Sequence, residues 1–217
     1  MFDLILFDLD GTLTDPKDGI TNCVKYALES FGIHENDMKK LLTFIGPPLY
    51  DSFRELYGFS HDDANRAVEK YRERFSTIGL FENDILDGAT EMLNSLKTNG
   101  KTLALATSKP YIFAKRIIEK FGMAEYFDYV VGAELDGSRN YKDEVIREVL
   151  SQADFGDLSK IVMVGDRKQD IIGAKKCGIA SIGVRCGYAE DNELEDAGAD
   201  FICENLYQLT DFLLNNS

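Results

Sequence analysis

The stretch that decides the fold of this chain is Leu4-Ile5-Leu6-Phe7-Asp8-Leu9-Asp10-Gly11-Thr12. Four apolar residues that give way to acidic residues and a glycine are typical of a buried parallel strand. Parallel sheets bind their ligands outside the carboxyl ends of the strands, where Asp8 and Asp10 lie. The spacing of two residues puts both carboxylates on one face of an extended chain, and Gly11 lets the backbone turn sharply beside them. We therefore expect the chemistry to begin here, with one carboxylate attacking and the other handling a proton.

From residue 84 onward, apolar strands alternate with helical segments. The strands are expected at 102–106, 129–131, 161–164, 180–184 and 201–202, and the helices at 88–98, 110–121, 141–151, 169–177 and 206–214. This alternation predicts an α/β fold built on a doubly wound parallel sheet.

The region before residue 84 has a different texture, because its apolar residues recur at helical spacing. Helices are expected at 17–31, 36–44, 48–57 and 61–76, the first with Asp15 as N-cap and Pro16 at its first position. The first strand precedes this block and the rest of the sheet follows it. We therefore predict an all-helical cap at 15–81 inserted into a catalytic core of 1–14 and 82–217, with hinges near Thr14 and at 80–84.

The composition restricts the partners and the compartment. A formal net charge of −14 disfavours nucleic acid, whose binding depends on clustered Lys and Arg. No apolar run approaches a membrane span and no leader precedes Asp3, so we expect a cytoplasmic protein that binds no membrane. Four cysteines that lie far apart in the sequence are expected to be reduced, mostly buried thiols.

Three further polar clusters follow expected strands of the core. They are Thr107-Ser108-Lys109, Tyr141-Lys142 and Gly165-Asp166 with Asp170 four residues beyond. Because parallel strands end at one edge of a sheet, we expect these clusters to converge there with Asp8. Lys109 is the exception: it could contact the substrate, but we expect it to be a surface lysine.

These residues, in this order and spacing, resemble the four motifs of the haloacid dehalogenase-like phosphohydrolases. The motifs are Asp8-Leu9-Asp10-Gly11-Thr12, Thr107, Lys142 and Gly165-Asp166-x-x-x-Asp170. The helical insertion is similar to that family's cap, so the resemblance covers nearly the whole chain. The phosphoglycolate phosphatase and 5′-nucleotidase-like branch is the most similar, including Ile45-Gly46-Pro47-Pro48-Leu49 in the cap.

The resemblance implies a magnesium-dependent phosphatase that hydrolyses small phosphate monoesters through an aspartyl-phosphate. Asp8 is then the nucleophile and Asp10 the acid that protonates the leaving group and later activates water. A magnesium ion would be held by Asp8, the carbonyl oxygen of Asp10 and Asp166.

The resemblance also implies how the transferring phosphate is held. Thr107, Lys142 and the main chain of Ser108 and Gly11 would bind its oxygens. Asp170 would orient the metal's water shell or Lys142.

Other functions share parts of this pattern. A phosphomutase acting on a small sugar phosphate would use the same core residues and return the phosphate to the sugar. A phospho-receiver or binding protein would hold a phosphate without turnover, although the cap and Asp10 argue against it. A dehalogenase would not need Asp10 as an acid. An EF-hand is excluded by the position of Gly11, and a P-loop kinase by the absence of its motif.

The cap is expected to select the substrate and to exclude water when it closes. The rigid loop at Gly46-Pro47-Pro48 precedes a helix from which Tyr50 or Arg54 could reach a ligand; the simpler expectation is that Arg54 is exposed on the helix. His34 and His61 lie in the same block and are expected at the surface. Phosphoglycolate and nucleoside monophosphates both remain candidate substrates.

Overall fold

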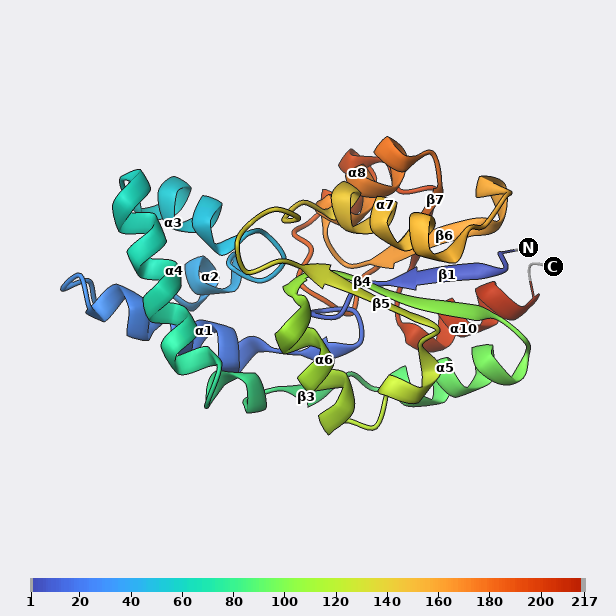
Figure 1. The fold of residues 1–217 in the computed structure, drawn as a ribbon, viewed down its shortest axis with the longest axis horizontal. Coiled ribbons are helices and arrows are strands. Elements are labelled where there is room, and N and C mark those ends of the chain that lie inside the picture. Colours follow the sequence, from blue (N-terminus) through green and yellow to red (C-terminus); the bar gives the residue numbers. More distant parts are fainter. Residues whose placement is uncertain (1, 216–217) are drawn as a thin grey trace. The chain divides into compact units, whose positions relative to one another are not determined.

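The structure, a computed structural model, describes residues 2–215, which form two compact units. The described residues up to Asp15 and from Ile85 onward make up the sheet unit, and Pro16–Asp84 make up the helical unit. Figure 1 labels the helices α1 to α4 of the helical unit and the sheet of the other unit.

The sheet unit is built on a six-stranded parallel sheet in the order β5-β4-β1-β6-β7-β8. The strands are β1 (Leu4–Phe7), β4 (Thr102–Pro110), β5 (Tyr129–Ala133), β6 (Ile161–Gly165), β7 (Ala180–Val184) and β8 (Phe201–Cys203). Two short strands, β2 (Thr14–Asp15) and β3 (Asp84–Ile85), pair with each other in a second sheet. The prediction of an α/β fold with a parallel sheet is confirmed.

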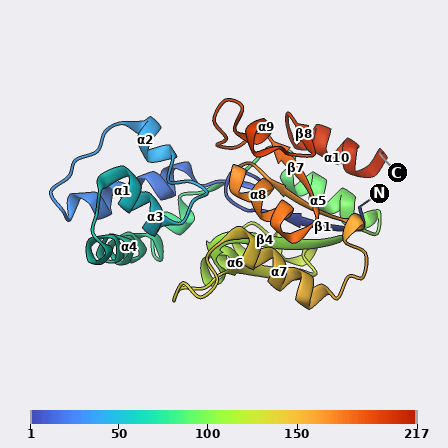
Figure 2. The ribbon, with the colours of Figure 1, turned by 90° about the horizontal axis from the view of Figure 1, so that it is seen from above.

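Helices cover both faces of this sheet. They are α5 (Ala89–Thr98), α6 (Tyr111–Lys120), α7 (Lys142–Ala153), α8 (Lys168–Cys177), α9 (Glu193–Ala197) and α10 (Leu206–Asn215), with 3-10 turns at Ala124–Tyr126 and Leu158–Lys160. In Figure 1, α7 and α8 lie on one face and α5 and α10 on the other. Figure 2 shows α6 and α7 beside β4 and, at the opposite edge, β8 with α9 and α10.

The central strand β1 is apolar along its whole length because both of its faces are covered. Leu4 and Leu6 are fully buried and belong to one core cluster with Met163 of β6 and Val149 of α7. Burial of each such side chain contributes about 1.5–3 kcal/mol to the free energy of unfolding. This packing fixes the strand that ends at Asp8.

The helical unit contains the four helices that the apolar spacing predicts. They are α1 (Lys17–Glu29), α2 (Met38–Leu42), α3 (Leu49–Tyr57) and α4 (His61–Phe75), followed by a 3-10 turn at Gly79–Phe81. Both α1 and α3 pack against α4. Helix α1 starts at Lys17 as predicted, but its predicted N-cap was one residue early: Pro16 is the N-cap, and Asp15 belongs to β2, where it accepts a hydrogen bond from the hydroxyl of Tyr188.

Strand β4 runs four residues beyond the predicted end because it contains a bulge. Thr107 pairs with Gly132 of β5, and the next pair is Pro110 with Ala133. Ser108 and Lys109 are therefore extra residues on β4, and such bulges redirect side chains. Gly132 permits the bulge, because a Cβ at this position would lie 2.6 Å from the carbonyl oxygen of Lys109.

Three smaller expectations concern single residues and spans. Among the described residues, no helix combines the length and apolar character that a membrane span requires. The four cysteines are free thiols, two of them buried (Cys23, Cys203) and two half-buried (Cys177, Cys186). His34 and His61 are exposed, as predicted.

Candidate active site

The polar residues singled out in the sequence lie at the carboxyl ends of neighbouring strands. Asp8 follows β1, Thr107 marks the start of the bulge in β4, and Asp166 follows β6. Lys142 is the first residue of α7, after β5. Strand β1 lies between β4 and β6: β4 and β5 are added on one side of it, and β6, β7 and β8 on the other. Open α/β sheets bind ligands at such a switch point. The predicted convergence at one edge is therefore confirmed.

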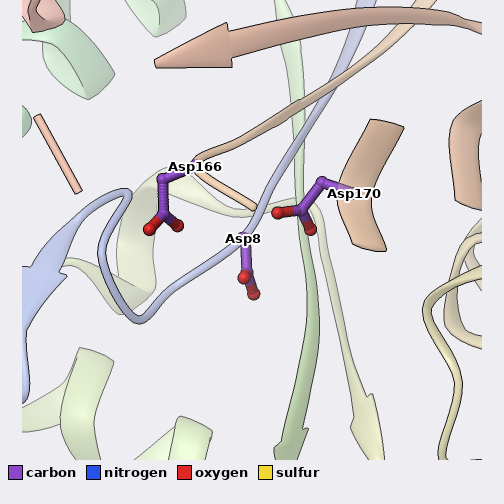
Figure 3. A group of neighbouring side chains, drawn as sticks. All are labelled: Asp8, Asp166 and Asp170. Atoms are coloured by element: carbon purple, nitrogen blue, oxygen red, sulfur yellow. The ribbon is translucent and has the colours of Figure 1, made fainter. Parts of the chain in front are cut away.

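Three carboxylates from two segments gather at this edge. Asp8, Asp166 and Asp170 each offer an oxygen within 4.8 Å of the others, and the three residues are 5%, 0% and 1% exposed. In Figure 3, Asp8 comes from the loop after β1, and Asp166 and Asp170 from the segment that enters α8. We call these three residues the acidic group.

Lys142 forms ion pairs with two members of the acidic group. Its Nζ lies 2.9 Å from Oδ1 of Asp8 and 2.8 Å from Oδ1 of Asp170, and it donates to the carbonyl oxygen of Ala106 at 3.0 Å. Burial alone would lower the pKa of Lys142, but the charges of Asp170 and Asp8 outweigh it and raise the pKa to about 12. Lys142 therefore stays charged beside Asp8.

Asp166 is held by two neighbouring loops. Thr12 donates its hydroxyl to Oδ1 at 3.0 Å, and the main-chain N–H of Tyr188 donates to Oδ2 at 2.8 Å. Burial, reinforced by the charges of Asp170 and Asp8, raises the pKa of Asp166 to about 8 against these hydrogen bonds. Burial also raises the pKa of Asp170, against the opposing charge of Lys142.

Glycines allow the backbone to touch the acidic group. A Cβ at Gly11 or at Gly187 would lie 2.2 Å from Oδ2 of Asp166, and one at Gly165 would lie 2.1 Å from Cγ of Asp170. Gly11 also has φ +82°, a conformation that side chains disfavour. The site thus has no room for side chains at these positions.

The acidic group fits a hard divalent cation. Three carboxylates face one lysine, and Oδ1 of Asp8 and of Asp170 are buried without a well-aligned hydrogen bond although Lys142 lies at ion-pair distance. Burial and, after it, the charges of the neighbouring carboxylates raise the pKa of Asp166. Oxygen ligands in this number suit Mg²⁺. The geometry therefore supports the predicted magnesium site at Asp8 and Asp166. Asp170 was predicted to orient the metal's water shell or Lys142, and it lies within the acidic group itself.

The carboxylate of Asp10 contacts Lys109, a residue that was predicted to lie at the surface. Oδ2 of Asp10 lies 2.5 Å from Nζ of Lys109. Lys109 is 9% exposed, so the expectation of a surface lysine was wrong. The reason is that β4 continues beyond its predicted end at residue 106 and through a bulge at Ser108 and Lys109, so this residue lies in the sheet and not in an exposed loop. Burial raises the pKa of Asp10, against the charge of Lys109.

The residues expected to hold phosphate lie around the same edge. Thr107 is buried, and its Oγ1 accepts a hydrogen bond from the main-chain N–H of Lys109 at 3.2 Å. Ser108 is half-buried in the bulge, and Gly11 lies against Asp166. Their contacts with a phosphate stay predictions.

Several residues of the site were not found from the sequence. Thr12 lies within the first motif and could have been found there. Gly187 and Tyr188 follow β7, so the rule that polar segments after strands build the site would have found them too. Arg167 pairs with Glu193 through Nε at 2.9 Å, and its main-chain N–H donates to Asp170 at 3.1 Å. No local sequence pattern predicts the pair of Arg167 and Glu193, because the two residues lie 26 positions apart.

In the helical unit, Tyr50 and Arg54 lie on α3. The hydroxyl of Tyr50 is 2.7 Å from Nδ1 of His61, and the guanidinium of Arg54 is 5.8 Å from the centre of the Tyr50 ring. Arg54 is exposed, in agreement with the simpler expectation, and lines a shallow pocket with Asp51 and Phe59.

The chain is similar to proteins of known family over most of its length. Residues 5–184 match the haloacid dehalogenase-like hydrolase family. A 5′-nucleotidase of Pseudomonas aeruginosa is 44% identical over 209 residues, which cover 96% of this chain and 94% of that protein.

Two further similarities bear on the chemistry. A tyrosine-protein kinase PtkA of Mycobacterium tuberculosis is 38% identical over 202 residues, 92% of this chain and 65% of that protein. The crystal structure of a predicted phosphatase from Clostridium acetobutylicum superimposes with a TM-score of 0.95 at 43% identity and covers 99% of each chain.

Proposed function

Because this chain belongs to the haloacid dehalogenase-like hydrolases, we propose that it is a magnesium-dependent phosphatase that hydrolyses small phosphate monoesters through an aspartyl-phosphate. The observation that carries the proposal is the Asp8 carboxylate, buried within the acidic group and 2.9 Å from Lys142. A carboxylate held between cations can approach a dianionic phosphate, which would otherwise repel it.

Asp8, Asp166 and the carbonyl oxygen of Asp10 would hold the metal. When bound, Mg²⁺ neutralises negative charge on the phosphoryl group and favours its approach to Asp8. Asp170 lies against Lys142 at 2.8 Å and keeps the lysine directed toward Asp8. Lys142, the Thr107 hydroxyl and the main-chain N–H groups of Ser108 and Gly11 would bind the phosphoryl oxygens, whose charge spreads in the transition state.

In the first step, an oxygen of Asp8 attacks phosphorus, and the bond from phosphorus to the ester oxygen breaks. The electron pair leaves with that oxygen, which takes a proton from Asp10 and departs as an alcohol. The raised pKa of Asp10, caused by burial, favours the protonated carboxyl that this step needs.

In the second step, water attacks phosphorus of the aspartyl-phosphate. Asp10, now ionised, takes a proton from the water, and the bond from phosphorus to the Asp8 oxygen breaks. Inorganic phosphate leaves, and both carboxyl groups return to their starting states. One difficult displacement is thus divided into two easier ones.

The helical unit would act as the cap that selects the substrate, with the segments near Thr14 and at 80–84 as hinges. A 5′-nucleotide is the first candidate substrate, because the similar Pseudomonas aeruginosa protein is a 5′-nucleotidase. Phosphoglycolate is the other candidate that the sequence resemblance implies.

The test is a phosphate-release assay on the purified chain over nucleotides, phosphoglycolate and sugar phosphates, with Mg²⁺ and with EDTA. We expect release that requires Mg²⁺, and a fall of at least ~10³-fold for Asp8→Asn. Asp3→Asn is the matched control, because Asp3 precedes the same strand and its side chain forms a partly exposed ion pair with Lys160. Full activity of Asp8→Asn, or a phosphate trapped on another residue, would contradict the proposal.

A second candidate is transfer of the phosphoryl group to an organic hydroxyl, as in a kinase or a phosphomutase. The similarity to PtkA favours it, since the same aspartyl-phosphate could be attacked by an alcohol in place of water. Adding a hydroxyl acceptor distinguishes the two: hydrolysis keeps phosphate release equal to substrate loss, whereas transfer lowers release and yields a phosphorylated acceptor.

A further inference from the structure

Lys109 is a buried cation for which the proposed mechanism has so far given no role. Its side chain is 6% exposed, that of Asp10 is 11% exposed, and the 2.5 Å separation of Nζ and Oδ2 joins them directly. A lysine is rarely buried unless it is paired, and the carboxylate of Asp10 is an ion-pair partner of Lys109. The pair lies beside the acidic group, not within it.

The local fold gives Lys109 this direction. The bulge inserts Ser108 and Lys109 into β4, and the Lys109 main-chain N–H is fixed on Thr107 Oγ1 at 3.2 Å. Gly132 leaves the space through which the bulged backbone passes. The sheet therefore holds the base of the lysine side chain, and the lysine in turn holds one oxygen of Asp10.

The second oxygen of Asp10 is left without a partner. Oδ1 is buried and receives no hydrogen bond, whereas Oδ2 is engaged by Lys109. A carboxylate turns readily about its last bond, because that rotation has broad minima. A charge-assisted hydrogen bond on one oxygen restricts the rotation and leaves the other oxygen in a defined place.

We propose that Lys109 is a positioning residue that clamps Oδ2 of Asp10 so that Oδ1 is the oxygen that exchanges the proton with the leaving group and with water. This inference rests on the proposed acid role of Asp10. Displacement of a reacting group by about 1 Å can cost ~10²-fold in rate, so loss of the clamp should weaken proton transfer without removing the nucleophile.

The test uses three substrates that separate leaving-group quality from charge. 4-Nitrophenyl phosphate has a good leaving group, propyl phosphate has a poor one without a second charge, and phosphoglycolate has a poor one with a carboxylate. The kcat/KM reports the step in which the leaving group departs. We expect Lys109→Met to lower kcat/KM at least tenfold more for propyl phosphate and for phosphoglycolate than for 4-nitrophenyl phosphate.

The ratio between substrates is measured on one protein sample, so partial loss of folded protein does not change it. Lys101→Met is the matched control, because Lys101 is equally buried at 8% exposure but lies just before β4 and binds the carbonyl oxygen of Phe2 at 2.7 Å. We expect its substrate ratio to equal that of the unaltered protein.

Two outcomes would overturn the inference. An equal loss on all three substrates would mean that Lys109 is structural, and a loss on phosphoglycolate alone would mean that it binds the remote carboxylate of the substrate. In the double variant Asp10→Asn with Lys109→Met, we expect no further loss on propyl phosphate beyond Asp10→Asn, because the lysine acts through Asp10. Additive losses would contradict this.

The failure of the proposed function looks different. If Asp10→Asn itself loses activity equally on good and poor leaving groups, the acid role of Asp10 is wrong. If Asp10→Asn is selective and Lys109→Met is not, only the role of Lys109 is wrong.

Discussion

At the scale of single residues, the site depends on positions where nothing but hydrogen fits. Gly187 is the clearest case. A Cβ there would meet Oδ2 of Asp166 at 2.2 Å and the carbonyl oxygen of Gly11 at 2.3 Å. Asp166 is held by the hydroxyl of Thr12 and by the N–H of Tyr188, so it cannot give way without moving the acidic group. The carbonyl oxygen of Gly11 is a backbone atom and cannot rotate away as a side-chain tip could.

Gly187→Ala is therefore expected to push Asp166 out of place. We predict a loss of about 1–3 kcal/mol in the free energy of unfolding and a rise of tenfold or more in the Mg²⁺ concentration that supports half-maximal activity. Urea denaturation and a magnesium titration of phosphate release measure the two effects. Gly156→Ala is the control, since a Cβ there meets nothing within 4 Å. Identical behaviour of the two variants would refute the steric argument.

Residue roles were predictable where a side chain directly follows a strand. Asp8 and Asp166 lie next to apolar runs that can be recognised in the sequence, and the topology then brings them together. Lys109 was misplaced because its direction depends on a bulge, and that bulge depends on Gly132, which lies 23 positions further along the chain. The partners of Asp10 and Asp166 thus required the tertiary structure.

At the scale of elements, β4 is both a core strand and part of the site. A Cβ at Gly132 would lie 2.6 Å from the carbonyl oxygen of Lys109 and 2.7 Å from the main-chain N of Tyr111. Both are backbone atoms, which cannot rotate away as a side-chain tip could. The bulge is therefore maintained by a glycine on the neighbouring strand.

We predict that Gly132→Ala shifts the bulge and lowers the free energy of unfolding by about 1–3 kcal/mol. The kcat/KM for propyl phosphate should fall as well, because Thr107 lies at the start of the bulge and Lys109 lies within it. Denaturation in urea and the phosphate-release assay check these outcomes. Unchanged stability together with unchanged kcat/KM would show that the neighbouring backbone adapts freely.

Long, periodic elements were predictable, and short or irregular ones were not. The helices α1 and α4 follow from apolar spacing over 13 and 15 residues. The five-residue α9 was not predicted because it is too short to show a period and its N-cap, Asn192, has φ 60°. The two-residue strands β2 and β3 exist through their mutual pairing, which no local pattern reveals.

At the scale of the whole molecule, the acidic group makes folding depend on pH. An unfolded aspartic acid ionises near pH 3.9, whereas burial beside other carboxylates raises the pKa of Asp166 to about 8 in the folded chain. The folded state therefore holds a proton that the unfolded state releases, and stability falls as pH rises between these values. The carboxylates with lowered pKa values begin to lose their stabilising effect only as pH falls below about 4.5, the ordinary pKa of glutamate.

We predict that the metal-free protein melts at a higher temperature at pH 5.5 than at pH 8. The slope should reach at most about 1.4 kcal/mol per pH unit for this group. Mg²⁺ requires ionised ligands, so it should raise the melting temperature more at pH 8 than at pH 5.5. Thermal melts with EDTA and with Mg²⁺ provide the measurement.

Asp166→Asn serves as the control for this pH dependence. The variant lacks the titrating group, so its metal-free melting temperature should vary less over the same range, and its response to Mg²⁺ should be small. An equal response to Mg²⁺ at both pH values in the unaltered protein would show that the acidic group does not bind the ion.

The pairing of β2 with β3 has a consequence for how such a protein can diversify. The entry and exit of Pro16–Asp84 adjoin two paired segments, so any replacement module whose ends lie as close together could be spliced in at the same two joints. Recombination there would leave the hydrogen-bond ladder from β5 to β8 uncut and replace the helical unit as a whole. The same sheet unit could in this way carry many different inserted modules.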